Sequence, residues 1–273
     1  MLRYSMDQVT SREWPFDKDI AYYQSLGIPA IAVNRRKLEA FGIERGLRLL
    51  RDSGMKVVCY LGTGYFTLSD ASKWPKELET AKATLALAAE MQSESILLMT
   101  GTPAKLSYEE AESRFLSILE KLLPMAEEHK MPLVLEPVGS MYLRLGYIHT
   151  LQDGLDLTDK VNSPWLKLCF EMSDMWIERR LYENIATRVK RIGLVQICDV
   201  VPGMHDYSRI ALGDGVVPIE RIIRAFQQAG YTGYYDIEML GPEVEKMGYE
   251  ETMRRSMEWV RRRDGKLSTE ITE

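Results

Sequence analysis

The sequence predicts an α/β fold, a single (β/α)8 TIM barrel, on three observations. Short apolar runs alternate with amphipathic helical patterns eight times along the 273 residues. The apolar runs are continuous, as in parallel strands covered on both faces, and do not alternate between apolar and polar residues. Each strand-plus-helix unit takes roughly 25 to 40 residues, which suits a closed barrel of this type.

The apolar runs and the helical patterns place the individual elements. The eight expected strands are Leu2–Met6, Ala30–Val33, Lys56–Leu61, Ser95–Met99, Leu133–Glu136, Leu166–Glu171, Leu194–Asp199 and Tyr234–Glu238. The eight expected helices are Phe16–Leu26, Ile43–Asp52, Lys76–Met91, Tyr108–His129, Leu151–Lys160, Leu181–Lys190, Ile219–Ala229 and Glu245–Arg262. Gly27, Gly54 and Gly230 support three boundaries, because each follows a helical pattern at the place where glycine commonly ends a helix.

A doubly wound open sheet is the alternative fold. That fold usually has a glycine-rich phosphate-binding turn after its first strand, and the residues that follow Met6 contain none. Gly62-Thr63-Gly64 follows the third expected strand but lacks a third glycine, so we interpret it as an active-site loop. We expect one barrel domain over residues 1–263 and a polar C-terminal tail over residues 264–273.

Charge and composition limit the classes of partner. The formal net charge is −5, whereas nucleic-acid-binding domains usually carry a basic stripe. No apolar run approaches the roughly 18 residues needed to span a bilayer, and Met1–Thr10 shows no cleavable leader pattern. The three cysteines lie in apolar runs outside any CxxC pair, which suggests a reducing compartment. We therefore expect a cytoplasmic protein that binds neither nucleic acid nor membranes.

Acidic and amide side chains occupy the ends of the later strands. Glu136, Glu171 and Glu238 each end an apolar run, and Gln196 and Asp199 lie in the seventh. The carboxyl ends of all barrel strands converge on one rim. Gathered like charges repel one another unless a divalent cation lies among them or some carboxyls keep a proton. Oxygen ligands favour Mn²⁺ or Mg²⁺, which we expect as the cofactor; the alternative is that each acid is a separate cap or salt bridge.

At these residues the sequence resembles the xylose-isomerase-like TIM barrel superfamily, which includes sugar phosphate isomerases and epimerases. The superfamily pattern is Glu at the end of strand five, Asp-x-x-His after strand six, His with a following Asp on strand seven, Arg before Gly-x-Gly, and Glu at the end of strand eight. The corresponding residues here are Glu136, Glu171-Met172-Ser173-Asp174, Gln196 with Asp199, Arg209 before Gly213-Asp214-Gly215, and Glu238. The resemblance covers most of the chain and is strongest from Leu133 to Glu238.

Three positions depart from that pattern. Glu171 replaces the metal-binding Asp, Asp174 replaces the His of strand six, and Gln196 replaces the metal-binding His of strand seven. Glutamine at the last position resembles the dehydratase branches of the superfamily, such as the inosose and dehydroshikimate dehydratases. The missing His at position 174 leaves the substrate open.

The resemblance implies a divalent-metal-dependent isomerase or epimerase acting on a small keto-sugar or polyol. Such an enzyme removes a proton next to a metal-bound carbonyl. Catalysis would fall to Glu136 and Glu238, and the metal ligands would be Glu136, Glu171, Gln196 and Glu238. Arg209 and Asp174 would contact the substrate, and Asp199 would orient Gln196 from behind. The alternative is a lyase that dehydrates a keto-polyol or eliminates the aglycone of a 3-keto-glycoside.

Two loop residues are further substrate-binding candidates. His205 follows the seventh expected strand, and an imidazole titrates in the range that suits proton transfer. Trp14 follows the first strand and could cover the apolar face of a sugar ring, or simply pack within its loop.

The basic residues and the superfamily bear on substrate charge and on assembly. Arg35, Arg36 and Lys37 are the only basic cluster suited to a phosphate, and we interpret them as a solvated helix start, so an unphosphorylated substrate is expected. The superfamily also contains an abasic-site endonuclease, but a nuclease needs more His ligands and a basic groove. A non-catalytic sugar-binding subunit and a homo-oligomer both stay open.

Overall fold

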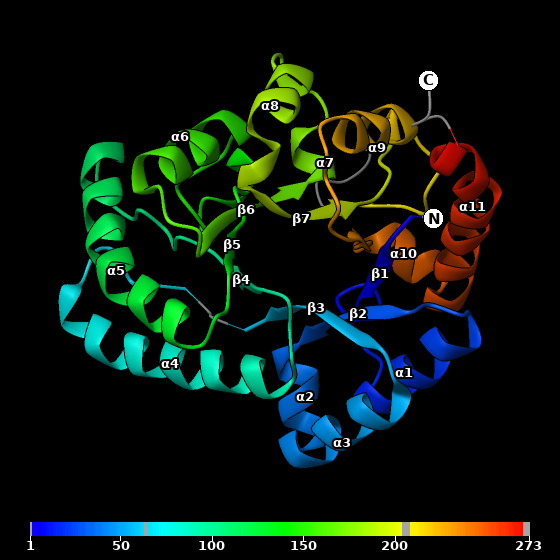
Figure 1. Ribbon diagram of the computed structural model, residues 1–273, viewed down its shortest axis with the longest axis horizontal. Helices are drawn as coiled ribbons and strands as arrows, with labels where there is room; N and C mark the ends of the chain where they lie inside the picture. Colours follow the sequence, from blue (N-terminus) through cyan, green and yellow to red (C-terminus); the bar gives the residue numbers. More distant parts are fainter. Residues whose placement is uncertain (1, 63–64, 204–207, 270–273) are drawn as a thin grey trace.

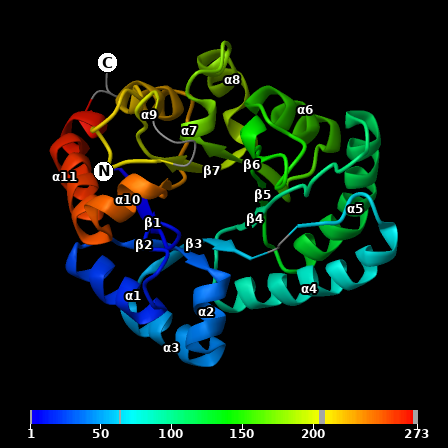
Figure 2. The ribbon, with the colours of Figure 1, turned by 180° about the vertical axis from the view of Figure 1, so that it is seen from behind.

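Eight parallel strands close into a barrel in a computed structural model that describes residues 2–62, 65–203 and 208–269. The strands follow one another around the barrel in chain order, and β8 pairs back to β1. Figures 1 and 2 show the helices as a ring around these strands. The predicted single (β/α)8 barrel is therefore confirmed. Within the described residues, no helix combines the length and the apolar character needed to cross a membrane.

The elements lie close to the runs from which they are predicted. The strands are β1 Tyr4–Asp7, β2 Ala30–Asn34, β3 Lys56–Leu61, β4 Ile96–Leu98, β5 Leu133–Leu135, β6 Leu166–Glu171, β7 Ile192–Ile197 and β8 Tyr235–Ile237. The α-helices are α1 Phe16–Ser25, α2 Arg35–Phe41, α3 Ile43–Ser53, α4 Trp74–Glu90, α5 Tyr108–Glu128, α6 Leu151–Val161, α7 Met172–Met175, α8 Leu181–Arg188, α9 Ile219–Gln228, α10 Pro242–Met247 and α11 Tyr249–Thr269. Three 3-10 turns are η1 Ala71–Lys73, η2 Ser140–Tyr142 and η3 Val189–Arg191.

Three short helices, α2, α7 and α10, were not expected. They are too short to show a helical repeat of apolar residues, and two of them start on a cap supplied by the preceding strand. The Asn34 side chain, at the end of β2, accepts from the backbone N–H groups of Arg36 and Lys37. The Glu171 side chain, at the end of β6, accepts from the N–H of Ser173. Both caps make the chain turn sharply at the carboxyl end of a strand.

Several boundaries differ from the prediction by a few residues, and two of these differences affect the account of the site and of the C-terminal segment. Strand β7 ends at Ile197 instead of Asp199, because Asp199 leaves the sheet and forms an isolated antiparallel bridge with Ile210. Helix α11 continues to Thr269, so the backbone of residues 264–269, expected as the start of a polar tail, is helical.

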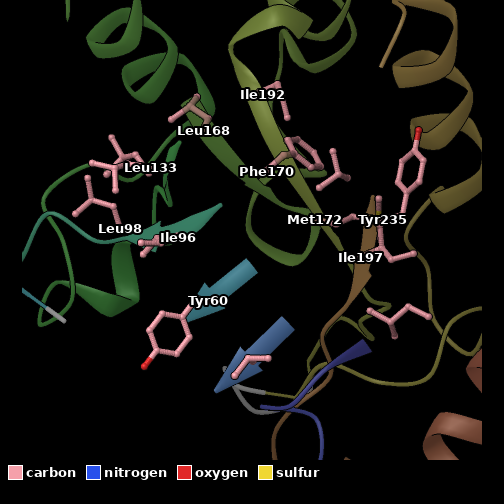
Figure 3. Packing of buried hydrophobic residues seen from close by; sticks show 14 of the residues in the cluster. Tyr60, Ile96, Leu98, Leu133, Leu168, Phe170, Met172, Ile192, Ile197 and Tyr235 are labelled. Carbon is pink, nitrogen blue, oxygen red and sulfur yellow. The ribbon is translucent and has the colours of Figure 1, made fainter. Parts of the chain in front are cut away.

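The apolar side chains form two separate clusters. The larger one lies between strands and helices: Phe170 of β6 packs edge to face on Phe226 of α9, with ring centroids 5.1 Å apart. Figure 3 shows Ile96, Leu98 and Leu133 of this cluster beside one another. The smaller cluster fills the inside of the barrel and consists of Ala30, Ala32, Val58, Cys59, Val134, Cys169 and Leu194. Because strand side chains alternate between faces, residues two positions after these inner ones also point into the barrel.

Candidate active site

The alternation along each strand brings the strand-end acids to one place. Glu136, Glu171 and Gln196 each stand two residues after an inner-cluster residue, so the barrel directs them inward at its carboxyl end. Glu171 and Gln196 are register partners in the β6–β7 pairing. These three side chains and Glu238 are all buried. Glu136, Gln196 and Glu238 line one pocket, together with Asp174 and Arg209.

Arg209 lies at the centre of this group. Its Nη1 atom is 2.8 Å from the Oε2 of Glu238 and 3.2 Å from the Oε2 of Glu171. The backbone N–H of Arg209 donates to the carbonyl of Leu240, which ties the segment carrying Arg209 to the segment after β8. Two buried carboxylates next to the guanidinium raise its pKa above its usual value, although burial alone would lower it. Arg209 therefore stays charged and forms ion pairs with both glutamates.

The two predicted catalytic glutamates are both shifted toward their protonated forms. Burial raises the pKa of Glu136 well above its usual value, and repulsion from Glu238 raises it further, while Arg209 opposes both effects. Burial raises the pKa of Glu238 to about 8, against the lowering effect of Arg209 and with a contribution from Asp7. Glu136 is thus hard to ionise while Glu238 is charged, and both carboxyls hold their protons more tightly than an exposed glutamate does.

Glu171 and Gln196 are held more tightly than the catalytic pair. The Oε1 of Glu171 accepts from the Ser173 backbone N–H at 2.8 Å and from its hydroxyl at 2.7 Å. The Oε2 of Glu171 is buried and accepts no hydrogen bond from the described residues. The side-chain oxygen of Gln196 accepts from the thiol of Cys169 at 3.0 Å.

The fit of a divalent cation can be tested on these groups. Three glutamates and one guanidinium leave an excess of negative charge in a buried site, and the Oε2 of Glu171 lacks a hydrogen-bond donor among the described residues. Carboxylate and amide oxygens are the donors that Mg²⁺ and Mn²⁺ prefer. Within the described part of the chain, however, no group of three or more His, Cys, Asp or Glu side chains stands ready to hold a metal ion. The donor chemistry fits such a cation, and its binding would require the carboxylates to draw together.

Asp174 stands where the superfamily pattern has a histidine, and it lines the pocket. Its Oδ2 accepts from the backbone N–H of Gly139 at 2.9 Å, so it joins the loop after β5 to the start of α7. A side chain at position 139 would place its Cβ 2.9 Å from the Asp174 carboxylate, which explains why glycine stands there. Burial, followed by the charge of Glu171, raises the pKa of Asp174.

Asp199 has a different role from the expected one. Its Oδ1 accepts from the N–H groups of Val200 and Val217 at 2.9 and 3.0 Å, and its Oδ2 from those of Gly213 and Gly215, both at 3.0 Å. Four backbone donors satisfy the carboxylate, which therefore holds the segment that carries Arg209 instead of orienting Gln196. The Gly-x-Gly motif allows the backbone to approach this carboxylate, because a Cβ at Gly215 would lie 2.3 Å from it.

Trp14, a predicted substrate contact, does not line the pocket. Trp14 packs edge to face on Tyr22 and Tyr249, with ring centroids 5.3 and 5.7 Å away, and Lys18 lies over its ring. These contacts take the side chain into the packing of α1 and α11, which is the alternative that the sequence left open for it. His205 lies outside the described residues.

The pocket is large and extends beyond the predicted residues. Its volume is about 1100 Å³, at the upper end of the roughly 300 to 1,000 Å³ common for ligand sites. Asp7 was not predicted, although it ends β1 and the rule that found the other strand-end acids also applies to it. Arg12 and Arg144 were not predicted either, because they lie in loops without a local signal. Burial, followed by the charge of Asp236, raises the pKa of Asp7 well above its usual value.

Similar proteins are found by sequence and by structure. The L-ribulose-5-phosphate 3-epimerase UlaE of Shigella sonnei is 28% identical over 167 residues, which are 59% of this chain and 54% of that protein. A solved structure from Sinorhizobium meliloti 1021 superposes with a TM-score of 0.87 at 25% identity and covers 95% of this chain and 97% of its own. The 3-keto-D-glucoside 4-epimerase YcjR of E. coli shares the fold, with a TM-score of 0.78 at 18% identity over 96% of this chain and 100% of that one.

The extent of these matches differs. The chain spans about half the length of the curated relatives it matches. The family described as xylose isomerase-like TIM barrel, in contrast, matches residues 20–263, from the first helix to the last, a range that includes Glu136, Glu171 and Glu238. The chain therefore belongs to the xylose isomerase-like TIM barrel family.

Proposed function

We propose that this protein is a sugar isomerase or epimerase that moves a proton next to the carbonyl of a small keto-sugar or of a polyol that carries a keto group. Glu136 and Glu238 are the proposed acid and base. One observation carries the proposal: the two glutamates directly follow β5 and β8, are both buried, and line the same pocket as Arg209, which pairs with Glu238. Strands β6 and β7 separate β5 from β8 around the barrel, so the two carboxyl groups reach the pocket from different sides.

The charge state of the pair suits a proton transfer in two steps. Burial raises the pKa of both glutamates and that of Glu238 only to about 8, so in this proposal one glutamate ionises and accepts a proton while the other still holds one to donate. Return of a proton to the opposite face of the same carbon gives an epimer, and return to the neighbouring carbon gives an isomer. Arg209 lowers the pKa of both glutamates and keeps the ionised form of the pair within reach near neutral pH.

We also propose that a divalent cation, Mn²⁺ or Mg²⁺, takes part. Glu136, Glu171, Gln196 and Glu238 are the residues that would hold it, because they offer only oxygen donors and carry more negative charge than Arg209 offsets. Such an ion, when bound, polarises a carbonyl and makes the neighbouring C–H more acidic. The ion pairs of Arg209 with Glu171 and Glu238 would then have to loosen, which leaves the guanidinium able to hold substrate oxygens.

The relatives support the isomerase or epimerase class. UlaE and YcjR are both named as epimerases of sugar derivatives, and UlaE matches over about half of its own length. Their substrates differ, so the class of reaction is the part that we carry over to this chain. Cytoplasmic location and a homo-oligomeric state remain expectations.

A screen for solvent deuterium tests the proposal. Purified protein is incubated in D₂O with keto-sugars and inososes, with and without Mn²⁺ or Mg²⁺, and recovered sugars are examined by NMR. We expect deuterium at the carbon next to the carbonyl, with a new epimer or isomer. An unsaturated product that absorbs in the ultraviolet would instead support the lyase, since expulsion of a β-hydroxyl shares the first step. Absence of exchange from every substrate, with metal bound, would contradict the proposal.

A further inference from the structure

The pocket is lined by basic as well as acidic residues. Besides Arg209, five basic residues line it: Arg12, Arg35, Arg36, Lys37 and Arg144. They come from three places in the chain, the loop after β1, the first turn of α2 and the loop after η2. The sequence shows only the run Arg35–Lys37, whereas the fold adds Arg12 and Arg144 to the same pocket. From the sequence alone, this run is interpreted as a solvated helix start and an unphosphorylated substrate is expected. The presence of Arg12 and Arg144 in the same pocket argues against that expectation.

Two of the five are already engaged within the protein. Arg35 pairs with Glu39 at 2.7 Å and donates to the carbonyl of Gly62 at 3.1 Å. The ammonium of Lys37 donates to the Asp19 carboxylate and to the Ser11 carbonyl, each at 2.7 Å. These two cations therefore shape the wall of the pocket and have little capacity left for a ligand.

Arg36 and Arg144 are different. Both are exposed, and neither side chain has a carboxylate partner among the residues that the structure describes. Tyr65, a half-exposed residue, lines the same pocket. Burial raises the pKa of the Tyr65 hydroxyl; the charges of Arg144 and Arg36 oppose this rise and the charge of Glu136 adds to it. The two arginines and Tyr65 thus share one pocket with the candidate catalytic carboxylate Glu136, which is buried while both arginines are exposed.

We propose that Arg36, Arg144 and Tyr65 form a subsite for an oxyanion carried by the substrate, a phosphate or a carboxylate. This inference rests on the proposed function and names the substrate class of the same site. Two guanidinium groups that line one pocket without a carboxylate partner repel each other, and an oxyanion between them would relieve that repulsion. Guanidinium groups bind both kinds of oxyanion through two parallel N–H donors. The size of the pocket leaves room for a sugar at Glu136 and Glu238 and for a charged group beyond it.

Binding of small anions tests the subsite without any turnover. Inorganic phosphate and acetate are titrated separately by calorimetry at constant ionic strength into the wild type, R36Q, R144Q, the double variant and R51Q. Arg51 is exposed in α3 and does not line the pocket, so R51Q is the matched control. We expect saturable binding that weakens about tenfold in each single pocket variant, since a charge-assisted hydrogen bond contributes on this scale, and an unchanged R51Q. The anion that binds more tightly identifies phosphate or carboxylate as the source.

Two results would overturn the inference: no saturable binding of either anion to the wild type, or binding that the double variant leaves unchanged. The deuterium assay distinguishes a failure of the subsite from a failure of the proposed function. We expect faster exchange with a phosphorylated or carboxylated keto-sugar than with its uncharged counterpart, and loss of that advantage in the double variant. If the charged and the uncharged keto-sugar exchange at the same rate, and the double variant exchanges both as fast as the wild type, the subsite is refuted and the proposed function stands. Anion binding without exchange from any sugar would refute the proposed function and keep the subsite.

Discussion

The Nη1 atom of Arg209 lies 2.8 Å from the Oε2 of Glu238, and this ion pair is buried at the carboxyl end of the barrel. The same nitrogen is 3.2 Å from the Oε2 of Glu171, so one guanidinium serves two carboxylates. Buried ion pairs are weak evidence for stability as such, but removal of one partner leaves an uncompensated charge. Arg209 is therefore required for the charge balance of the site as well as for its proposed chemistry.

Replacement of Arg209 by Met should destabilise the protein and abolish exchange. The loss should be roughly 3 to 5 kcal/mol in the free energy of unfolding, because Glu171 and Glu238 would stay buried without their cation. The pKa of Glu238 should rise above its value of about 8, since Arg209 lowers it. Urea titration measures the stability, with R254Q as the control; Arg254 forms exposed ion pairs with Glu251 and Glu258, so its loss should matter little. Equal stability losses in the two variants would contradict this role of Arg209.

Replacement of Asp199 by Ala should loosen the segment that carries Arg209. Four backbone N–H groups would lose their acceptor, and we expect a loss of at least about 3 kcal/mol in the free energy of unfolding. D70A is the matched control, because Asp70 caps an exposed turn and accepts from one backbone N–H. If D199A unfolds like the wild type, the carboxylate does not hold this segment.

The stability of the protein should fall as the pH rises from about 4 to 6, in part because of Asp19. Burial raises the pKa of Asp19 to about 6, against the lowering effects of Lys37, Ser11 and Gln8. A carboxyl whose pKa is higher in the folded than in the unfolded state holds its proton more tightly when folded. Its contribution is therefore complete below the ordinary carboxyl pKa of about 3.9 and is lost as the pH rises through about 6.

Two variants isolate this effect. D19N keeps a neutral side chain at the buried position, so urea titrations at several pH values should show a smaller fall in stability than in the wild type. D17N alters an exposed carboxylate of the same helix and should leave the pH dependence unchanged. A D19N profile that matches the wild type would show that another group titrates in this range.

Removal of divalent metal should stop the reaction without unfolding the barrel. Elemental analysis of the purified protein should find close to one Mn²⁺ or Mg²⁺ per chain. If the protein is purified without metal, it should bind close to one equivalent after either ion is added. Chelation should abolish solvent exchange, and either ion should restore it. Circular dichroism should change little, because the apolar clusters do not depend on the metal. Full activity in the chelated protein would contradict the proposed metal.

The fold was predictable because its signal is local and repeated. Each buried strand is a continuous apolar run in the sequence. In the later strands an acid follows the run at the carboxyl rim, as in Leu133 to Glu136. The gathering of Glu136, Gln196 and Glu238 in one pocket then follows from barrel closure. The same rule, applied to β1, would have included Asp7.

Contacts between distant loops were not predictable in this way. Asp199 follows a strand like the other acids, yet it binds backbone N–H groups of residues 200–217, which no pattern in the sequence reveals. Arg144 and Arg36 are more than 100 residues apart in the chain. They share a pocket only because the loop after η2 and the start of α2 both lie at the rim. Trp14 follows β1 as a rim residue would, but neighbouring aromatic rings draw it away from the pocket.

Deuterium exchange in the Glu136→Gln and Glu238→Gln variants tests the central claim most directly. The wild type, both variants and E90Q, which changes an exposed glutamate at the end of α4, are incubated in D₂O with a substrate found in the screen. Exchange at the carbon next to the carbonyl should fall by roughly 10² to 10⁴-fold in each pocket variant, with E90Q unchanged and every variant folded. Exchange at the wild-type rate in either E136Q or E238Q, with the fold intact, would contradict the assignment of these two glutamates as the acid and the base.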